Sequence, residues 1–240
     1  MTSGAGRTDV GRLRKNNEDA IVVVPAGRLY AVVDGMGGLA AGEVAADHAV
    51  QALRGVPATP DVPSDRALVA AFEDARARIL RDGTAHPERK EMGAVATAAR
   101  IDADGLGFTL AHVGDTRAWL VGDGGVRQLT VDHVERVGAG RPRVCRDFGR
   151  PQLPERWVDV QHVRARRGDL LVLASDGLHD SVPADELERT FVRLRAERLA
   201  PDAAAGRLVA LALLHGGHDN VSVVVVRMMG TRTTTTDTLS

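Results

Sequence analysis

Short apolar segments with the character of β-strands occur at the beginning, in the middle and at the end of this chain, and pairs of helical segments separate them. Helix pairs must bury their apolar faces against a sheet, and closely spaced strands joined by Asp-Gly turns form antiparallel meanders. The pattern therefore predicts a layered α+β domain and argues against a doubly wound nucleotide-binding fold. The expected strands are residues 21–24, 29–33, 95–99, 107–113, 117–121, 126–129, 169–174 and 221–227, and the expected helices are residues 40–53, the stretch after Asp65, residues 184–198 and residues 202–215.

The remaining segments are expected to be irregular. Residues 55–63 contain three prolines and are predicted to be a connector, and residues 134–157 are rich in Arg, Gly and Pro. No internal repeat or linker divides the chain. We therefore expect one domain, residues 1–229, followed by a disordered tail, residues 230–240.

Composition excludes several classes of protein. Lys and Arg total 31 and Asp and Glu 32, so the formal net charge of -1 gives no reason to expect binding to nucleic acid or to an anionic membrane. No run of about 18 apolar residues is present, and the first nine residues lack the apolar stretch of a secretory signal. The single cysteine, Cys145, cannot form an internal disulfide, which suits a reducing compartment. We therefore expect a cytoplasmic protein.

Four aspartates stand where apolar strands are expected to begin or end. Asp34 follows residues 31–33, Asp115 lies in the turn after residue 113, Asp176 follows residues 173–175, and Asp219 precedes the last strand. Strand ends hold side chains rigidly, and a neighbouring glycine lets a backbone carbonyl approach a ligand closely. Carboxylates that converge at one edge of a sheet repel each other unless a cation neutralises them. Such oxygen ligands suit Mg²⁺ or Mn²⁺, so the pattern indicates a divalent metal site.

Each aspartate alone has a simpler explanation, because an Asp-Gly pair after a strand is most often only a turn. The pairs Asp104-Gly105 and Asp123-Gly124 are expected to be turns and nothing more. The metal interpretation of the other aspartates therefore depends on the residues around them.

Those surroundings form five motifs in a fixed order. They are Asn16-Asn17-Glu18-Asp19, Val33-Asp34-Gly35-Met36-Gly37-Gly38, His112-Val113-Gly114-Asp115-Thr116-Arg117, Ser175-Asp176-Gly177-Leu178 and Asp219-Asn220-Val221. The series resembles the metal-dependent protein serine/threonine phosphatases of the PPM family (protein phosphatase type 2C), over residues 8–227, and most of all the small bacterial members. The resemblance implies a four-layer α-β-β-α sandwich of two antiparallel sheets flanked by helix pairs, with metals in a cleft at one end.

The resemblance also implies a set of metal ligands. Asp34 would bridge two metal ions, and the carbonyl group of Gly35 would bind the second. Asp176 and Asp219 would bind the first ion. Asp115, together with Asp176, would hold a third and weaker ion. The implied cofactors are thus two Mn²⁺ or Mg²⁺ ions, and the resemblance allows a third, weaker ion.

Three residues near the N-terminus complete the implied site. Glu18 and Asp19 match acidic residues that act on the metals largely through water, and Arg14 matches the arginine that binds the substrate phosphate. Two divalent ions lower the pKa of a water molecule, which can then attack phosphorus in line. The guanidinium of Arg14 can pair with two phosphate oxygens at once. No covalent intermediate is needed, so Cys145 is not expected to be a nucleophile.

The sequence departs from the family in two places. Many members carry a histidine, the candidate general acid, near the positions of Met36 and Leu39, and the next histidine here, His48, is expected to lie too far away. We therefore expect a metal-bound water to deliver the proton to the leaving group. Residues 134–149 are shorter than the flap of bacterial relatives and contain Arg136, Arg141, Arg143 and Arg146. This segment either attracts acidic phosphosubstrates or is merely a solvated loop.

Polar residues beside the motifs have structural explanations that we prefer. Asn220 is expected to brace Asp219 and its turn, Arg117 to pair with a carboxylate near Asp115, and His112 to pack on a strand. A supporting role is also expected for Thr97, Asp132 and His133.

The resemblance predicts a metal-dependent hydrolase of phosphoserine and phosphothreonine in proteins that opposes bacterial serine/threonine kinases. The expected partners are phosphoprotein substrates and a kinase, with no nucleic acid and no membrane, and the expected state is a monomer. Two alternatives remain: a catalytically weak phosphatase-fold binding module, and a specialised phosphatase in a regulatory switch. Retention of the predicted ligands disfavours the first.

Overall fold

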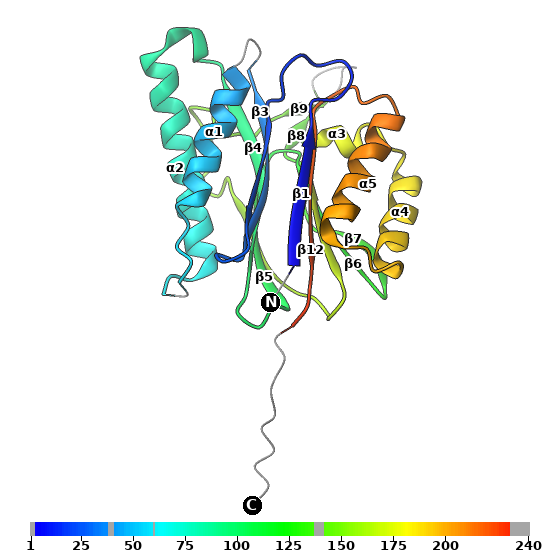
Figure 1. The fold of residues 1–240 in the computed structure, drawn as a ribbon. Helices are drawn as coiled ribbons and strands as arrows, with labels where there is room; N and C mark the ends of the chain where they lie inside the picture. The colour runs from blue at the N-terminus through cyan, green and yellow to red at the C-terminus, as the bar shows by residue number, and fades with distance from the viewer. Residues whose placement is uncertain (1–2, 38–40, 60, 137–141, 231–240) are drawn as a thin grey trace, which may run out of the picture.

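The computed structural model describes residues 3–37, 41–59, 61–136 and 142–230, and every structural statement below concerns these residues. Two large antiparallel sheets stack face to face, and a pair of helices covers the outer face of each (Figure 1). The expected four-layer α-β-β-α sandwich is therefore confirmed. The expected tail lies outside the described residues from residue 231 onward.

The first sheet contains five strands, which run in spatial order β10-β5-β4-β3-β2. Their bounds are β2 (Asp19–Val24), β3 (Leu29–Met36), β4 (Gly93–Ile101), β5 (Gly107–Val113) and β10 (Asp159–Arg164). The second sheet also has five strands, in spatial order β1-β12-β11-β6-β7. Their bounds are β1 (Ser3–Asp9), β6 (Arg117–Gly122), β7 (Gly125–Gln128), β11 (Leu170–Ala174) and β12 (Val221–Arg227).

The helices pack in pairs on the outer faces of the sheets (Figure 1). On the first sheet lie α1 (Ala41–Arg54) and α2 (Ser64–Ala85), and on the second lie α4 (Ala184–Ala196) and α5 (Pro201–Leu214). Each helix pair encloses an apolar cluster with its sheet, and a third apolar cluster lies between the two sheets. Ala, Val and Leu dominate all three clusters, as expected for a chain with 3% aromatic residues. None of the described helices combines the length and the apolar character needed to cross a bilayer.

Two edge strands were not predicted from the sequence. Strands β1 and β10 lie at the edges of their sheets, and most of their residues are exposed or only half-buried. Because apolar periodicity reports a buried face, polar edge strands escape it. Gly4 allows β1 to pass over Tyr30, since a Cβ at Gly4 would lie 2.3 Å from the ring.

Two further details correct the sequence-based expectations. Asp34 does not follow its strand but lies inside β3, whose ladder with β4 continues through Gly35 to Met36. Residues 134–157 are not wholly irregular, because β8 (Val134–Glu135) pairs with β9 (Arg143–Val144) in a separate small ribbon. Between them, residues 137–141, and with them Arg141 of the predicted basic flap, lie outside the described residues, as does Leu39.

Candidate metal centre

Side chains from several distant segments line one cleft. The ends of the strands that carry them lie at the upper end of the sandwich in Figure 1. The cleft has a volume of about 260 Å³. Its lining includes six of the predicted metal ligands and the arginine that is predicted to bind the phosphate. These lining residues are Glu18, Asp34, Gly35, Asp115, Asp176, Asp219 and Arg14, together with Met36, Gly37 and Asn220.

Strands β2 and β3 position the first pair of carboxylates. Asp19 is the first residue of β2 and lies opposite Asp34 in the antiparallel ladder. The carboxylate of Asp19 does not line the cleft: it is 9% exposed and accepts a hydrogen bond of 2.6 Å from the hydroxyl group of Ser175. The backbone of Gly35 donates to the carbonyl oxygen of Glu18, at 3.1 Å, which holds Glu18 beside the end of β3.

The ends of β11 and β12 bring Asp176 and Asp219 into the cleft. Asp176 begins α3 (Asp176–His179), a single helical turn directly after β11. Asn220 fixes the segment before β12, because its side-chain amide donates to the carbonyl oxygens of Val10 and Asn16 at 2.9 Å. Its side-chain oxygen accepts the backbone N–H of Glu18 at 2.8 Å. Asn220 therefore braces the turn of Asp219, as predicted, and also ties it to the loop that carries Glu18.

The turn between β5 and β6 presents Asp115. Gly114 has a φ of 98°, a backbone conformation that favours glycine. The ring of His133 accepts the backbone N–H of Gly114 at 3.1 Å, and the backbone N–H of His133 donates to the carbonyl oxygen of Gly114 at 2.7 Å. Arg117, next to this turn, forms a two-pronged ion pair with Asp132, with N–O distances of 2.9 and 2.7 Å. The expected partner of Arg117 is thus identified.

Arg14 lies in the loop between β1 and β2 and reaches over the cleft. One of its Nη atoms lies 2.7 Å from a carboxylate oxygen of Asp219, and the Arg14 side chain is 52% exposed. This hydrogen bond to Asp219 raises the pKa of Arg14. The guanidinium is therefore charged, held at the rim and accessible from solvent.

The carboxylates strongly influence each other's protonation. Burial, and after it the charges of Asp19, Asp176, Asp115 and Asp219, raise the pKa of Asp34 well above its ordinary value. Burial, and then the neighbouring carboxylates, raise the pKa of Asp176 to about 8. Burial is also the main reason that the pKa values of Asp19 and Asp115 rise to about 6. A cluster of this kind favours a bound cation, because a cation offsets both the burial and the repulsion.

The donor set fits hydrated divalent ions. Five carboxylates line the cleft, and Arg14 is the one cationic side chain among its described lining residues. No three of the described His, Cys, Asp and Glu side chains are gathered closely enough to enclose an ion by themselves. Mg²⁺ commonly binds through one or two carboxylates and keeps several water ligands, and its ligands are hard oxygens like those present here.

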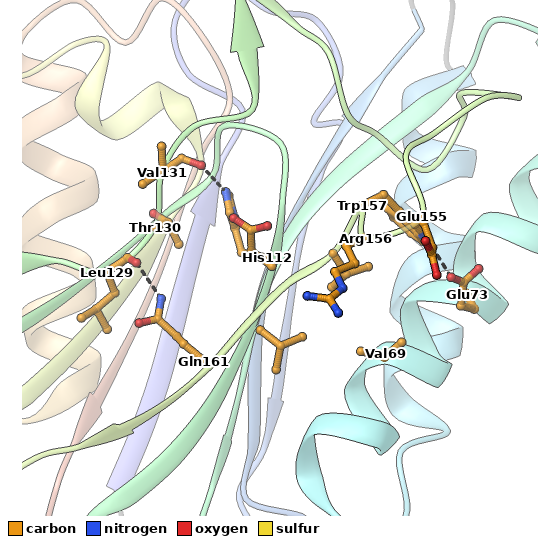
Figure 2. A pocket seen from close by; sticks show the side chains of 13 residues that line it. Val69, Glu73, His112, Leu129, Thr130, Val131, Glu155, Arg156, Trp157 and Gln161 are labelled. Carbon is orange, nitrogen blue, oxygen red and sulfur yellow. Dashed lines mark hydrogen bonds between the residues drawn. The ribbon is translucent and has the colours of Figure 1, made fainter.

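A larger pocket of about 620 Å³ lies beside His112, between α2 and β10, but it has a different chemistry (Figure 2). None of the predicted metal ligands lines it. His112 is 2% exposed, and its ring pairs with the hydroxyl group of Thr97 and the carbonyl oxygen of Val131, at 2.9 and 3.2 Å. His112 therefore packs on its strand, as expected. We assign the chemistry to the smaller cleft because the carboxylates converge there.

Other predicted residues lie away from the cleft. The Nε2 atom of His48 lies 3.0 Å from a carboxylate oxygen of Asp82 and joins α1 to α2, and His48 does not line the cleft. Arg146 of the basic segment contacts Asp159, with an N–O distance of 3.4 Å. Cys145 does not line the cleft.

Sequence reasoning missed two residues that affect the cleft. Ser175 holds Asp19 through its hydroxyl group, although the sequence only marked it as part of a motif. Asp180 adds negative charge near the cleft and contributes to the raised pKa values of Asp115 and Asp176. The spacing of Asp180, four residues after Asp176 at the start of a helix, was the available signal, since such residues share a helix face.

Comparisons with known proteins show which family this chain resembles. A family model described as protein phosphatase 2C matches residues 12–212. The serine/threonine protein phosphatase PstP of Mycobacterium tuberculosis is 37% identical to this chain over 238 residues, which cover 92% of this chain. This chain spans only 44% of the length of that mycobacterial relative.

Two further proteins extend the comparison. The serine/threonine phosphatase stp of Listeria monocytogenes is 29% identical over 248 residues, covering 92% of this chain and 93% of the relative. A solved structure described as the catalytic domain of PstP in complex with two manganese ions superposes with a TM-score of 0.82 and 30% identity. That superposition covers 95% of this chain and 98% of the solved chain.

Proposed function

Because this chain belongs to the protein phosphatase 2C family, we propose that it is a divalent-metal-dependent hydrolase of phosphoserine and phosphothreonine in proteins. The observation that carries the proposal is the convergence of five carboxylates and Arg14 in one cleft. The cofactors are two Mn²⁺ or Mg²⁺ ions, in keeping with the manganese complex of the related PstP domain. A third ion is an additional part of the proposal.

We carry the metal ligands over from the family resemblance, and most of the matching groups line one cleft. Asp34, whose pKa is raised by burial and by four other carboxylates, would bridge the two ions, and the carbonyl group of Gly35 beside it would bind one of them. Asp176 and Asp219 would hold the other ion, and Asp115 with Asp176 the third. Glu18 and the buried Asp19 would act through water. When bound, the ions supply a water molecule of lowered pKa and offset charge on the phosphate.

Arg14 is assigned to the substrate phosphate. Its guanidinium is half exposed at the rim and uses one nitrogen for Asp219, and a guanidinium carries five N–H donors in a planar fork. Such a fork can donate two parallel hydrogen bonds to phosphate oxygens and orient the ester for in-line attack.

The leaving alkoxide needs a proton, and the described lining of the cleft contains no histidine. His48 is engaged with Asp82 on the outer face of the first sheet. We therefore assign the proton transfer to water, in agreement with the sequence-based expectation.

The physiological setting is also part of the proposal. We propose that residues 1–229 form one catalytic domain, because the two sheets share an apolar cluster between them. Phosphoproteins modified by serine/threonine kinases would be the substrates. A monomeric state and a cytoplasmic location stay predictions.

The test is phosphate release from a phosphothreonine peptide in the presence of Mn²⁺. We expect wild-type protein to turn over and Asp34→Asn to lose at least about a hundredfold in rate, since the change removes the shared ligand. Asp115→Asn should weaken turnover or its metal dependence. Asp47→Asn, the same change on the exposed face of α1, is the control and should retain the wild-type rate. Equal rates for wild-type protein and Asp34→Asn would contradict the assignment.

A further inference from the structure

A pocket lined by arginines lies at the opposite end of the sandwich from the carboxylate cleft. It is formed by the C-terminal end of α4, the β6–β7 turn, the residues before β11 and the end of β12, all at the lower end in Figure 1. The charged residues in its lining are Asp123, Arg167, Arg195, Arg198 and Arg227. We call this the arginine pocket, and we propose that it binds a small molecule that carries several phosphate groups.

The charge of the arginine pocket is poorly balanced by the residues around it. Four arginines face one aspartate in its lining, and Asp123 is already bonded to Arg195 at 2.6 Å. Among the described residues, Arg167, Arg198 and Arg227 form no ion pair. Burial, followed by repulsion from Arg198 and Arg195, lowers the pKa of Arg227. The positive charges of Arg195, Arg198 and Arg227 therefore lie close enough to repel one another. A polyanion would relieve this repulsion.

Part of the cluster has a structural explanation, and part has none. Arg227 donates to the carbonyl oxygens of Leu199 and Gly168, at 2.8 and 3.3 Å, and Arg195 also reaches Asp169 at 3.5 Å. These contacts hold in place the segment that follows α4 and the segment that precedes β11. They do not account for Arg167 and Arg198, whose side chains form no hydrogen bond among the described residues. The Nε atom of Arg195 is buried and has no hydrogen-bond partner among the described residues.

Arg198 also stands where the backbone favours another residue. It follows the end of α4 and has a φ of 49°, in the left-handed region. Helices often end with a residue in this conformation, and that residue is usually glycine because it has no Cβ. An arginine at this position gives up that advantage and places a guanidinium beside the pocket.

The size and donor chemistry of the arginine pocket identify the class of ligand. Its volume of about 670 Å³ falls in the range of small-molecule sites, roughly 300–1,000 Å³. Guanidinium groups bind phosphate oxygens through paired N–H donors, and several of them can share a chain of phosphates. A pocket of this limited size favours a compact polyphosphate over a long nucleic acid, which binds along an extended basic groove.

The test is isothermal titration of sodium tripolyphosphate into the full chain at about 0.15 M salt. One arm contains no divalent metal, and the other contains Mg²⁺ in excess of the ligand. We expect one site in wild-type protein and at least about tenfold weaker binding in the double variant Arg167→Ser with Arg198→Ser. The control is Arg189→Ser with Arg193→Ser, which removes the same charge from exposed positions of α4 and should bind within about twofold of wild-type.

Three results would overturn the proposal: no binding by wild-type protein, an equal loss in the control, or a loss in Arg14→Ala with none in the arginine-pocket variant. A single-stranded oligonucleotide that binds more tightly than tripolyphosphate, and depends on Arg167 and Arg198, would assign a nucleic-acid surface instead.

ATP serves as the second probe. If ATP and tripolyphosphate bind equally, the pocket recognises the phosphate chain alone, and if ATP binds more tightly, the pocket recognises a nucleotide. Both results support the proposed pocket. Because the readout is binding, the phosphatase proposal is tested separately.

Discussion

At the scale of single residues, Asp34 and Arg14 have opposite charges and different roles in the cleft. Asp34 is a half-buried carboxylate in the cleft, and burial and the neighbouring carboxylates raise its pKa, so a bound cation would favour its charged form. Arg14 is half exposed and paired with Asp219, so its charge is retained at the rim, where an anionic substrate would arrive. The same cleft therefore provides a cation site below and an anion site at its edge.

We expect Arg14→Lys to lower kcat/KM for a phosphothreonine peptide by about tenfold or more. A lysine retains the charge but loses the planar pair of donors that fits a phosphate. Steady-state kinetics at saturating Mn²⁺ measures this effect. Arg12→Lys is the matched control, because Arg12 lies two residues away and bonds to the carbonyl oxygen of Leu213. Unchanged kinetics in Arg14→Lys would show that the fork does not bind phosphate.

Much of the site could be predicted at the residue scale. The five sequence motifs assigned Glu18, Asp34, Asp115, Asp176 and Asp219 to one metal site, and in the structure these residues line one cleft. What the sequence could not provide were contacts between residues far apart in the chain. The hydrogen bond from Ser175 to Asp19 joins residues 156 positions apart, and no local pattern encodes it.

At the scale of elements, the cleft depends on how closely α3 packs against the start of β12. Gly177 follows Asp176 on α3, and a Cβ at Gly177 would lie 1.9 Å from the carbonyl oxygen of Asn220. Only glycine allows this approach, which keeps Asp176 and Asp219 on the same side of the cleft.

We expect Gly177→Ala to destabilise the fold by about 2 kcal/mol, because backbone atoms of Asn220 would have to move. Gly206→Ala is the control on α5, where an added Cβ meets no atom within 4 Å. That change should stabilise the protein by about 0.5–1 kcal/mol, as for alanine in a helix interior. Urea unfolding of both variants measures the difference. Equal stabilisation by the two substitutions would contradict the close packing of α3.

The central strands were predictable as elements, whereas the edge strands were not. Strands β4, β5, β11 and β12 are almost entirely buried and read as apolar runs. Strand β10 has a mainly exposed pattern, and its polar sequence resembles a loop. The pairing partners that make β10 a strand, residues 107–112 of β5, lie about fifty positions earlier in the chain.

At the scale of the whole molecule, charge is distributed unevenly along the sandwich. A formal net charge of -1 hides a carboxylate cleft at one end and an arginine pocket at the other. The carboxylate cleft makes the stability of the metal-free protein depend on pH. The folded protein holds a proton on Asp176 up to about pH 8, whereas an unfolded chain releases it near pH 4.

Between these values the folded state binds more protons than the unfolded state, so stability falls as pH rises. We expect the melting temperature of the chelated protein to fall from pH 6.5 to pH 8.5. This window avoids the opposite effect of His112 and His179, whose lowered pKa values matter only below about pH 6.5. Asp176→Asn should flatten the curve and melt higher at pH 8.5, whereas Asp47→Asn should follow wild-type. A wild-type melting temperature that rises across this range would contradict the account.

The central claim is that the carboxylate cleft acts through divalent cations, and metal removal tests it most directly. The measurement is phosphate release from a phosphothreonine peptide in Mn²⁺, after chelation with EDTA, and after Mn²⁺ is restored in excess. We predict that the wild-type rate falls to background on chelation and returns with Mn²⁺, and that Asp34→Asn does not recover. Undiminished turnover in EDTA, or absence of turnover with every divalent metal tested, would contradict the claim.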